Sequence, residues 1–352
     1  MTVYVAVDFH ARQQTISYCD LADGEIHRAT LRHQHDDVRA FYARFTGEVI
    51  VGLEASGYSA WFEQMLAELG HTVWLGNPAE IRRKAPRRQK NDRRDAELML
   101  DLMMKGDFPR LHRFSDESRL VLRQLRYRHK LVKVRTIAKN SLHAIGINAG
   151  LPLKRRLLTQ KGIRQLQTLP LSPVLATQRD EWLQLVALMS QRIATVEAAL
   201  QQKAENDAAV ALLLTHPGIG LLTALALRYT LMPVSRFANT RKVTAYVGLD
   251  CLEDQSSERR RMGSISKAGS RLLRFLLNEA GQSACRSDPD LKRFYRRLLY
   301  RRDRPKAKVA VARKLLVRSF IMLRDQIDYA EFVRRGVAAR VARYPHSRMT
   351  EI

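Results

Sequence analysis

Two short apolar segments decide the fold of this chain: VYVAV at Val3–Val7 and EVIVGL at Glu48–Leu53. Both are rich in β-branched residues, and the second has the pattern of a strand that is buried on both faces. Between them, Thr15–Cys19 and Ile26–Leu31 also have strand composition, and a turn at Asp23-Gly24 joins them. We therefore expect a hairpin between these two strands.

The segments after residue 54 alternate between helix and strand patterns. Ser59–Leu69 is helical and stops at Gly70, and Thr72–Leu75 is a fifth strand. Hairpin-linked strands followed by alternating helix and strand predict an α/β domain of the ribonuclease-H-like type. A doubly wound nucleotide-binding fold would instead have a helix directly after its first strand.

The remainder of the chain is expected to be mainly helical. Long helical stretches occur at Ser118–Ile145 and Glu181–Asn206, and the second repeats apolar residues at helical spacing, as in a coiled coil. We expect four segments: an α/β domain at residues 1–112, a helical coiled-coil region at 113–207, a mainly α domain at 208–330 and a basic tail at 331–352.

Charge indicates the class of partner. The 352 residues include 61 Lys and Arg against 35 Asp and Glu, which gives a net charge of +26. Such an excess predicts a polyanionic partner, most often nucleic acid, and a membrane surface is the alternative. Hydrophobic residues make up 45% of the chain, which is enough for a folded core and excludes a wholly disordered basic chain.

Two features bear on the compartment. The three cysteines, Cys19, Cys251 and Cys285, have neither zinc-site spacing nor a disulfide framework, so we expect a reducing cytoplasm. The most apolar stretch, Val210–Leu227, is interrupted by His216 and a Pro-Gly pair, so no membrane span is expected.

Four acidic residues stand out in this basic chain. Asp8 and Glu54 follow strands that are neighbours in a sheet of this order, so the two carboxylates should converge. Asp92 and Asp95 have i, i+3 spacing at the start of a predicted helix, which places both on one face. Clustered carboxylates raise one another's pKa unless a cation lies between them. Because oxygen ligands suit Mg²⁺ or Mn²⁺, the group predicts a metal site for two-ion cleavage of phosphodiesters.

Each acid also has a purely structural interpretation. Asp8 could form a turn at a strand end, Asp92 could be an N-cap, and Asp95 could interact with the helix dipole. Glu54 is harder to explain in this way, because Glu is unfavourable in strands.

A second unusual segment is YVGLDCLEDQSSERRRMGSISKAGS at Tyr246–Ser270. Its candidate site residues are Ser256, Ser257, Arg259, Arg260, Arg261 and Lys267. A serine hydroxyl can attack a phosphodiester and form a phosphoserine link to DNA, and nearby arginines would neutralise the phosphate. The alternative is a polar loop whose arginines only contact phosphates.

The sequence HPGIG at residues 216–220 precedes an Ala- and Leu-rich segment. A Pro-Gly-x-Gly turn between helices exposes backbone N–H groups that can bind phosphate. Gly218 and Gly220 are therefore candidate nucleic-acid contacts in a helix–hairpin–helix motif, and a plain interhelical turn is the alternative.

Together these motifs resemble the DEDD transposases of the "IS one-ten" insertion-sequence family, which includes Piv/MooV-type invertases and bridge-RNA-guided recombinases. The resemblance covers about residues 3–325. It rests on VAVD with Asp8, GLEASG with Glu54, KNDRRDAE with Asp92 and Asp95, HPGIG, AYVGLDCLEDQSS and GSISKAGSRLLRFLLNEA.

The resemblance implies a site-specific recombinase or transposase that cuts and rejoins DNA strands. Its N-terminal domain would be RuvC-like. The acids that would hold Mg²⁺ there are Asp8, Glu54, Asp92 and Asp95. The C-terminal domain would supply a nucleophilic serine, which an ungapped match to the family's Ser-Ser-Gly pattern places at Ser256. A one-residue gap would place it at Ser257, which otherwise stands where the family has Gly.

The resemblance also implies the partners. Donor and target DNA would be chosen with a noncoding guide RNA encoded at the end of the element. The middle helices would pair subunits, which implies a homo-oligomer, either a dimer or a tetramer. In such an oligomer the acids and the serine can come from different subunits.

Two other functions stay open. A RuvC-like structure-specific endonuclease would hydrolyse DNA with the acids alone and needs no serine. A basic architectural or RNA-binding protein with a degenerate site is the third possibility, and the four intact acids argue against it.

Overall fold

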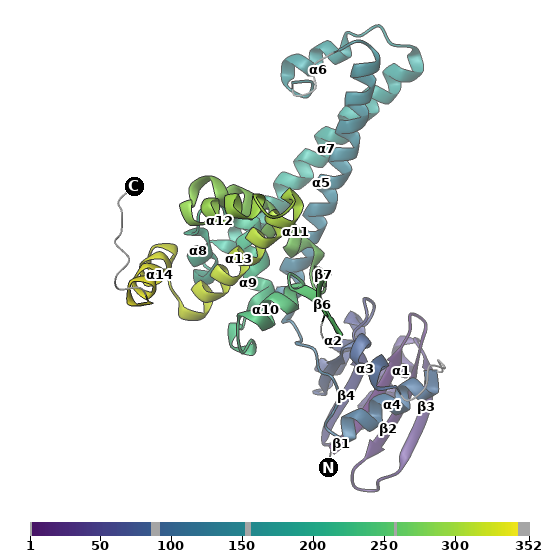
Figure 1. Cartoon of the computed structure of the whole chain (residues 1–352). Coiled ribbons are helices and arrows are strands. Elements are labelled where there is room, and N and C mark those ends of the chain that lie inside the picture. The colour runs from purple at the N-terminus through teal and green to yellow at the C-terminus, as the bar shows by residue number, and fades with distance from the viewer. Residues whose placement is uncertain (1, 86–91, 152–155, 257–258, 344–352) are drawn as a thin grey trace. The chain divides into compact units, whose positions relative to one another are not determined.

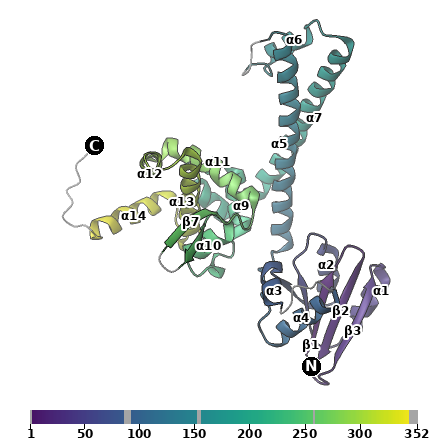
Figure 2. The same cartoon turned by 45° about the vertical axis from the view of Figure 1, so that its right-hand side comes forward.

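The structure is a computed structural model that describes residues 2–85, 92–151, 156–256 and 259–343. The chain forms two compact units, Met1–Ser115 and Asp116–Ile352. The first is a mixed α/β unit and the second is mostly helical (Figures 1 and 2), which confirms this part of the expected fold class. Of the segments that the sequence suggested, 208–330 and all but the first three residues of 113–207 fall within the second unit.

A five-stranded sheet forms the centre of the first unit. Its strands are β1 (Thr2–Phe9), β2 (Gln13–Asp20), β3 (Ile26–Arg32), β4 (Glu48–Glu54) and β5 (Thr72–Gly76). They lie in the order β3-β2-β1-β4-β5. The three N-terminal strands are antiparallel neighbours, whereas β1, β4 and β5 run parallel. Each strand matches one that the sequence predicted, and β1 and β4 are neighbours, as the acidic-site prediction requires.

Helices cover both faces of this sheet. They are α1 (His35–Ala43), α2 (Ala60–Glu68), α3 (Pro78–Lys84) and α4 (Asp92–Met104). Val5 and Val7 of β1 pack with α1 and α2, whereas Ala6 packs with α3 and α4 on the other face. Alternate residues of a strand point to opposite faces, so a strand covered on both sides is apolar at successive positions.

Two long antiparallel helices, α5 (Asp116–Asn148) and α7 (Pro173–Ala204), begin the second unit, with α6 (Gln160–Gln167) between them (Figure 1). The guanidinium of Arg128 in α5 donates to Glu197 in α7, with its Nε atom 2.8 Å from Oε1. The pair therefore forms a helical hairpin, in agreement with the two long helices expected here.

The rest of the second unit is a helical bundle with one two-stranded sheet. Its helices are α8 (Ala208–Leu214), α9 (Leu221–Leu231), η1 (Val234–Arg236), α10 (Thr240–Val247), α11 (Arg271–Ser287), α12 (Pro289–Leu299), α13 (Arg304–Asp325) and α14 (Tyr329–Arg343). The sheet is a hairpin of β6 (Cys251–Ser256) and β7 (Arg259–Ile265). The sequence analysis did not predict this hairpin, because its strands are short and strongly polar.

Part of the basic tail expected at 331–352 lies in the last helix, α14, which continues to Arg343. The backbone N–H of Tyr329 donates to Thr215 Oγ1 at 2.9 Å. Asp328 accepts a hydrogen bond from the backbone N–H of Glu331 at 2.7 Å, which satisfies a free donor of the first helical turn. Residues 344–352 lie outside the described part of the chain.

In the described residues, no helix is both long enough and apolar enough to cross a bilayer. The three cysteines are free thiols, with Cys19 buried and Cys251 exposed.

Candidate active site

Asp8 and Glu54 lie level with each other at the ends of neighbouring parallel strands. Ala6 of β1 is paired with Gly52 of β4. Ala6 packs with α4, and a Cβ atom on Gly52 would lie 2.3 Å from Sδ of Met103 in the same helix. Asp8 and Glu54 follow two residues later in each strand. Because side chains alternate along a strand, both acids point to the face that α4 covers.

The helix α4 contributes the other two acids. Asp92 and Asp95 precede the buried residues Ala96, Met99 and Met103 at intervals of three and four. Residues at these intervals share one helix face, so the two acids continue the stripe that packs on the sheet. Both also lie in the first turn, where the helix dipole favours negative charge.

His10 lies between two of these acids, and the sequence analysis did not identify it. Its Nε2 atom is 3.1 Å from Oδ2 of Asp8 and 3.4 Å from Oδ2 of Asp92. One ligand atom from each of the three residues lies within 4.8 Å of the other two, which is compact enough for one cation. The available signal was the Asp-x-His spacing, since extended backbone directs alternate side chains to one side.

Negative charge exceeds positive charge in this group. Burial raises the pKa of Asp8, the imidazole of His10 lowers it, and the carboxylates of Asp92 and Asp95 raise it again, with a net upward shift. The Asp8 side chain is only 13% exposed, so water screens its charge poorly. A divalent cation would relieve this repulsion, and carboxylate oxygens beside an imidazole nitrogen are suitable ligands for it.

The other three acids are not all equally close to Asp8. The compact group contains Asp8, His10 and Asp92. Asp95 is near enough to act electrostatically on Asp8, and Glu54 is placed beside Asp8 by the strand register. The structure therefore gathers three side chains that could bind a metal ion around one point, with two further carboxylates near them.

Ser256 lies at the end of the β6–β7 hairpin. It is the last residue of β6, and its backbone is paired with Arg259, the first residue of β7. Arg260 and Arg261 are paired with the two residues that precede Ser256. Ser257 lies outside the described residues. The described backbone thus brings one candidate serine and the arginine stretch together in the second unit, whereas the acids belong to the first.

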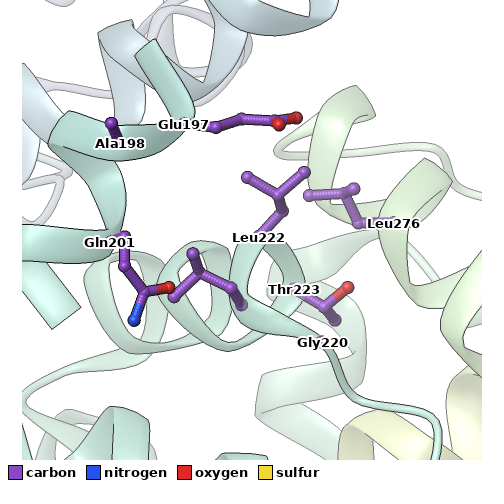
Figure 3. Close-up of a pocket in the computed structure, with 8 residues that line it drawn as sticks. Glu197, Ala198, Gln201, Gly220, Leu222, Thr223 and Leu276 are labelled. Carbon is purple, nitrogen blue, oxygen red and sulfur yellow. The ribbon is translucent and has the colours of Figure 1, made fainter. Parts of the chain in front are cut away.

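The Pro-Gly-x-Gly turn joins α8 to α9, and its two glycines differ. Gly218 has a φ of +90°, and a Cβ atom there would lie 2.4 Å from the backbone nitrogen of Ala284 in α11. The left-handed φ and the close contact with α11 account for Gly at position 218, and its role as a nucleic-acid contact stays a prediction. A Cβ atom on Gly220 would meet nothing within 4 Å. Gly220 borders a cavity of about 560 Å³, which Glu197 also lines (Figure 3). Its role in binding phosphate stays a prediction.

Comparisons with known families match both units of the chain. Residues 5–145, which include the four acids and His10, match the DEDD transposase model of IS110. Residues 210–296, which include Ser256 and Lys267, match the "Transposase IS116/IS110/IS902 family". The chain belongs to this family of transposases. The two matched regions of the transposase together span well over half of its residues.

Individual relatives are also named as transposases. The transposase is 27% identical over 301 residues to the "Probable family 20 transposase" of Pseudomonas aeruginosa, a match that covers 80% of this chain and 88% of the relative. It is also similar to the transposase for insertion sequence element IS1328 of Yersinia enterocolitica, with 27% identity over 65% of this chain and 68% of the relative. The transposase for IS1111A of Coxiella burnetii is 24% identical over 78% and 79% of the two chains.

Proposed function

We propose that this transposase cleaves and rejoins DNA strands with a divalent-metal site in its first unit and a serine nucleophile in its second. The observation that carries the proposal is the convergence of Asp8, His10 and Asp92, whose ligand atoms lie within 4.8 Å of one another. Family membership supports the reaction class.

The residues proposed to hold Mg²⁺, or Mn²⁺ in its place, are Asp8, Glu54, Asp92 and Asp95. When bound, the cation supplies positive charge to the scissile phosphate. His10, whose Nε2 atom lies 3.1 Å from Oδ2 of Asp8 and 3.4 Å from Oδ2 of Asp92, is proposed as a nitrogen ligand beside these carboxylates. Because the Asp8 side chain is nearly buried, its position is set before DNA binds, which favours a preorganised site.

Ser256 is the proposed nucleophile. Its Oγ atom forms a bond to phosphorus, the bond from phosphorus to one deoxyribose oxygen breaks, and the serine proton is transferred to a base. The released oxygen leaves as a hydroxyl. The phosphoserine link keeps the energy of the broken bond, so a free hydroxyl on another strand can reverse the step and join new strands. Arg259, Arg260 and Arg261 neutralise the phosphate. A one-residue gap in the family pattern would transfer the nucleophilic role to Ser257.

The proposed partners are donor and target DNA, a noncoding guide RNA, and further copies of this chain in a dimer or tetramer. The net charge of +26 suits binding to more than one polyanion. The helical hairpin leaves apolar side chains exposed, including Ile137 at 59% and Leu188 at 45%. Such residues on adjacent long helices support pairing between subunits.

A suicide DNA substrate tests the serine mechanism. After the reaction is denatured, wild-type protein should carry labelled DNA. Ser256→Ala should bind nucleic acid normally and give neither the adduct nor recombinant product, whereas Ser257→Ala should be milder. Asp8→Asn should also lose the adduct while keeping DNA binding. If neither serine substitution affects strand exchange, the serine mechanism is wrong.

A hydrolytic endonuclease is the second candidate. One observation favours it: the compact group of metal ligands is made entirely by the first unit, so the acids could act without the serine. The same experiment decides between the two, because hydrolysis would release only free DNA ends from the wild-type protein.

A further inference from the structure

A cavity of about 530 Å³ lies beside the turn that follows β7, against α11 and α13. Arg271, Arg274, Phe275 and Asn278 line it from α11, and Lys267 lines it from the turn. The four residues of α11 recur at intervals of three and four, so they share one helix face. The volume lies within the range of small-ligand sites.

Three cations, Lys267, Arg271 and Arg274, line this cavity. In the part of the chain that the structure describes, no carboxylate pairs with Lys267, Arg271 or Arg274. The guanidinium of Arg274 donates instead to the backbone carbonyls of Val247, at 3.0 Å, and Ala268. Burial lowers the pKa of Arg274, and the charge of Arg271 lowers it further. Like charges held together in this way favour an anion as ligand.

Lys267 occupies a strained backbone conformation. Its φ of +55° lies in the left-handed region, which is unfavourable for a side chain other than that of Gly or Asn. The N–H of Lys267 donates to the carbonyl of Gly248 at 3.2 Å, and a Cβ atom on Gly248 would lie 2.2 Å from the carbonyl oxygen of Ala268. Close packing therefore fixes the turn and holds the lysine beside the cavity. Strain that is kept at one point is a sign of a functional position.

The cavity also offers an aromatic ring and an amide. Phe275 is 45% exposed, and the ring of His129 in α5 packs against it with centroids 4.9 Å apart. Asn278 Oδ1 is buried and has no hydrogen-bond partner among the described residues. Buried polar atoms are rarely left without a partner, so this amide calls for a ligand with a polar edge.

We propose that this cavity binds one unpaired nucleotide of a nucleic-acid strand. Lys267 and Arg271 contact its phosphate, the ring of Phe275 stacks on its base, and the amide of Asn278 hydrogen-bonds the edge of the base. The inference rests on the nucleic-acid substrate of the proposed function, but not on the metal site or the serine. A base within a duplex is stacked on both faces and cannot stack on Phe275. Single-stranded DNA and RNA share the required chemistry.

Anisotropy titrations with the full-length protein test this site. The probes are a fluorescein-labelled 12-nucleotide DNA strand, an RNA strand of the same sequence, and the DNA duplex. Phe275→Leu removes the ring without changing charge and should weaken binding of a single strand about tenfold, since stacking on aromatic side chains contributes that order of affinity. Binding of the duplex should change less than about twofold. Tyr300→Leu is the matched control, because Tyr300 is 90% exposed and does not line the cavity.

Arg271→Gln tests the phosphate contact. It should lower the slope of log affinity against log salt by about 0.7 on a single strand. An equal loss on DNA and RNA supports the shared nucleotide chemistry, and a loss on one strand alone identifies that strand as the ligand. With strands that contain 5-iodouracil, the peptide crosslinked in the wild-type protein should contain Phe275.

The proposal would be overturned if Phe275→Leu and Tyr300→Leu changed the affinity for a single strand equally. It would also be overturned if Phe275→Leu weakened the binding of duplex and single strand equally. Absence of any nucleic-acid binding by the wild-type protein would instead contradict the proposed function itself. Circular dichroism of each variant establishes that it is folded, and this is expected because the Phe275 ring is half exposed.

Discussion

Protonation of His216 gives a quantitative test of the packing around the Pro-Gly-x-Gly turn. The His216 side chain is fully buried. Its Nδ1 atom lies 2.9 Å from the carbonyl oxygen of Pro217, and its ring centroid lies 4.6 Å from that of Tyr329 in α14. Burial lowers the pKa of His216 from 6.5 to about 4.

The direction of the pH effect follows from this shift. Because the folded pKa lies below the unfolded one, the stability contributed by neutral His216 is complete above pH 6.5 and is lost as the pH falls toward 4. The shift in the pKa of His216 contributes about 3 kcal/mol to the free energy of unfolding, and about 2 kcal/mol of this is lost between pH 7 and pH 5. Arg318 lowers the pKa of His216 and Asp288 raises it. The pKa of Asp288 is itself below its usual value, so Asp288 keeps its charge over this range.

Urea unfolding of the full chain, followed by circular dichroism at pH 7 and pH 5, measures this effect. The wild-type free energy of unfolding should fall by about 2 kcal/mol more than that of His216→Gln, which cannot titrate there. The substitution itself lowers the free energy of unfolding at both pH values, so this cost cancels when the two pH-dependent changes are compared. If the two proteins change in parallel to within about 0.5 kcal/mol, burial of a neutral His216 is not a determinant of stability in this region.

Three further predictions concern the turn, the metal site and a buried ion pair. Gly218→Ala should lower the free energy of unfolding by about 2 kcal/mol or more in urea, because a left-handed φ and a contact with α11 oppose the methyl group. Gly220→Ala has open space and should cost less than about 1 kcal/mol; equal costs would contradict the packing argument. Mn²⁺ affinity, measured by calorimetry, should fall as the pH is lowered, because protons compete for Asp8, whose pKa is raised. An affinity that Asp8→Asn leaves unchanged would exclude Asp8 as a ligand. Arg318→Met should destabilise the protein by about 3–5 kcal/mol, because it leaves Asp288 buried without the cation that pairs with it, and adding Asp288→Asn should recover much of that loss in urea unfolding.

The sheet and the acids that end its strands could be predicted because their signals are local. β1 and β4 are apolar over consecutive residues, and Asp8 and Glu54 directly follow those runs. The i, i+3 spacing of Asp92 and Asp95 requires only a regular helix. The helices α1 and α3 gave no comparable signal, since each is short and has few buried residues.

Only the tertiary structure decided how side chains from separate elements meet. His10 bridges Asp8 and Asp92 because α4 packs across the end of β1, and no pattern over a few residues reports a contact between positions 10 and 92. The cavity that Lys267 shares with α11 depends in the same way on a turn held by Gly248 and on α13 behind it. A periodic pattern determines which face of an element is buried. Which polar groups then lie within a few ångströms of one another depends on the packing of several elements at once, and that packing is a property of the whole fold.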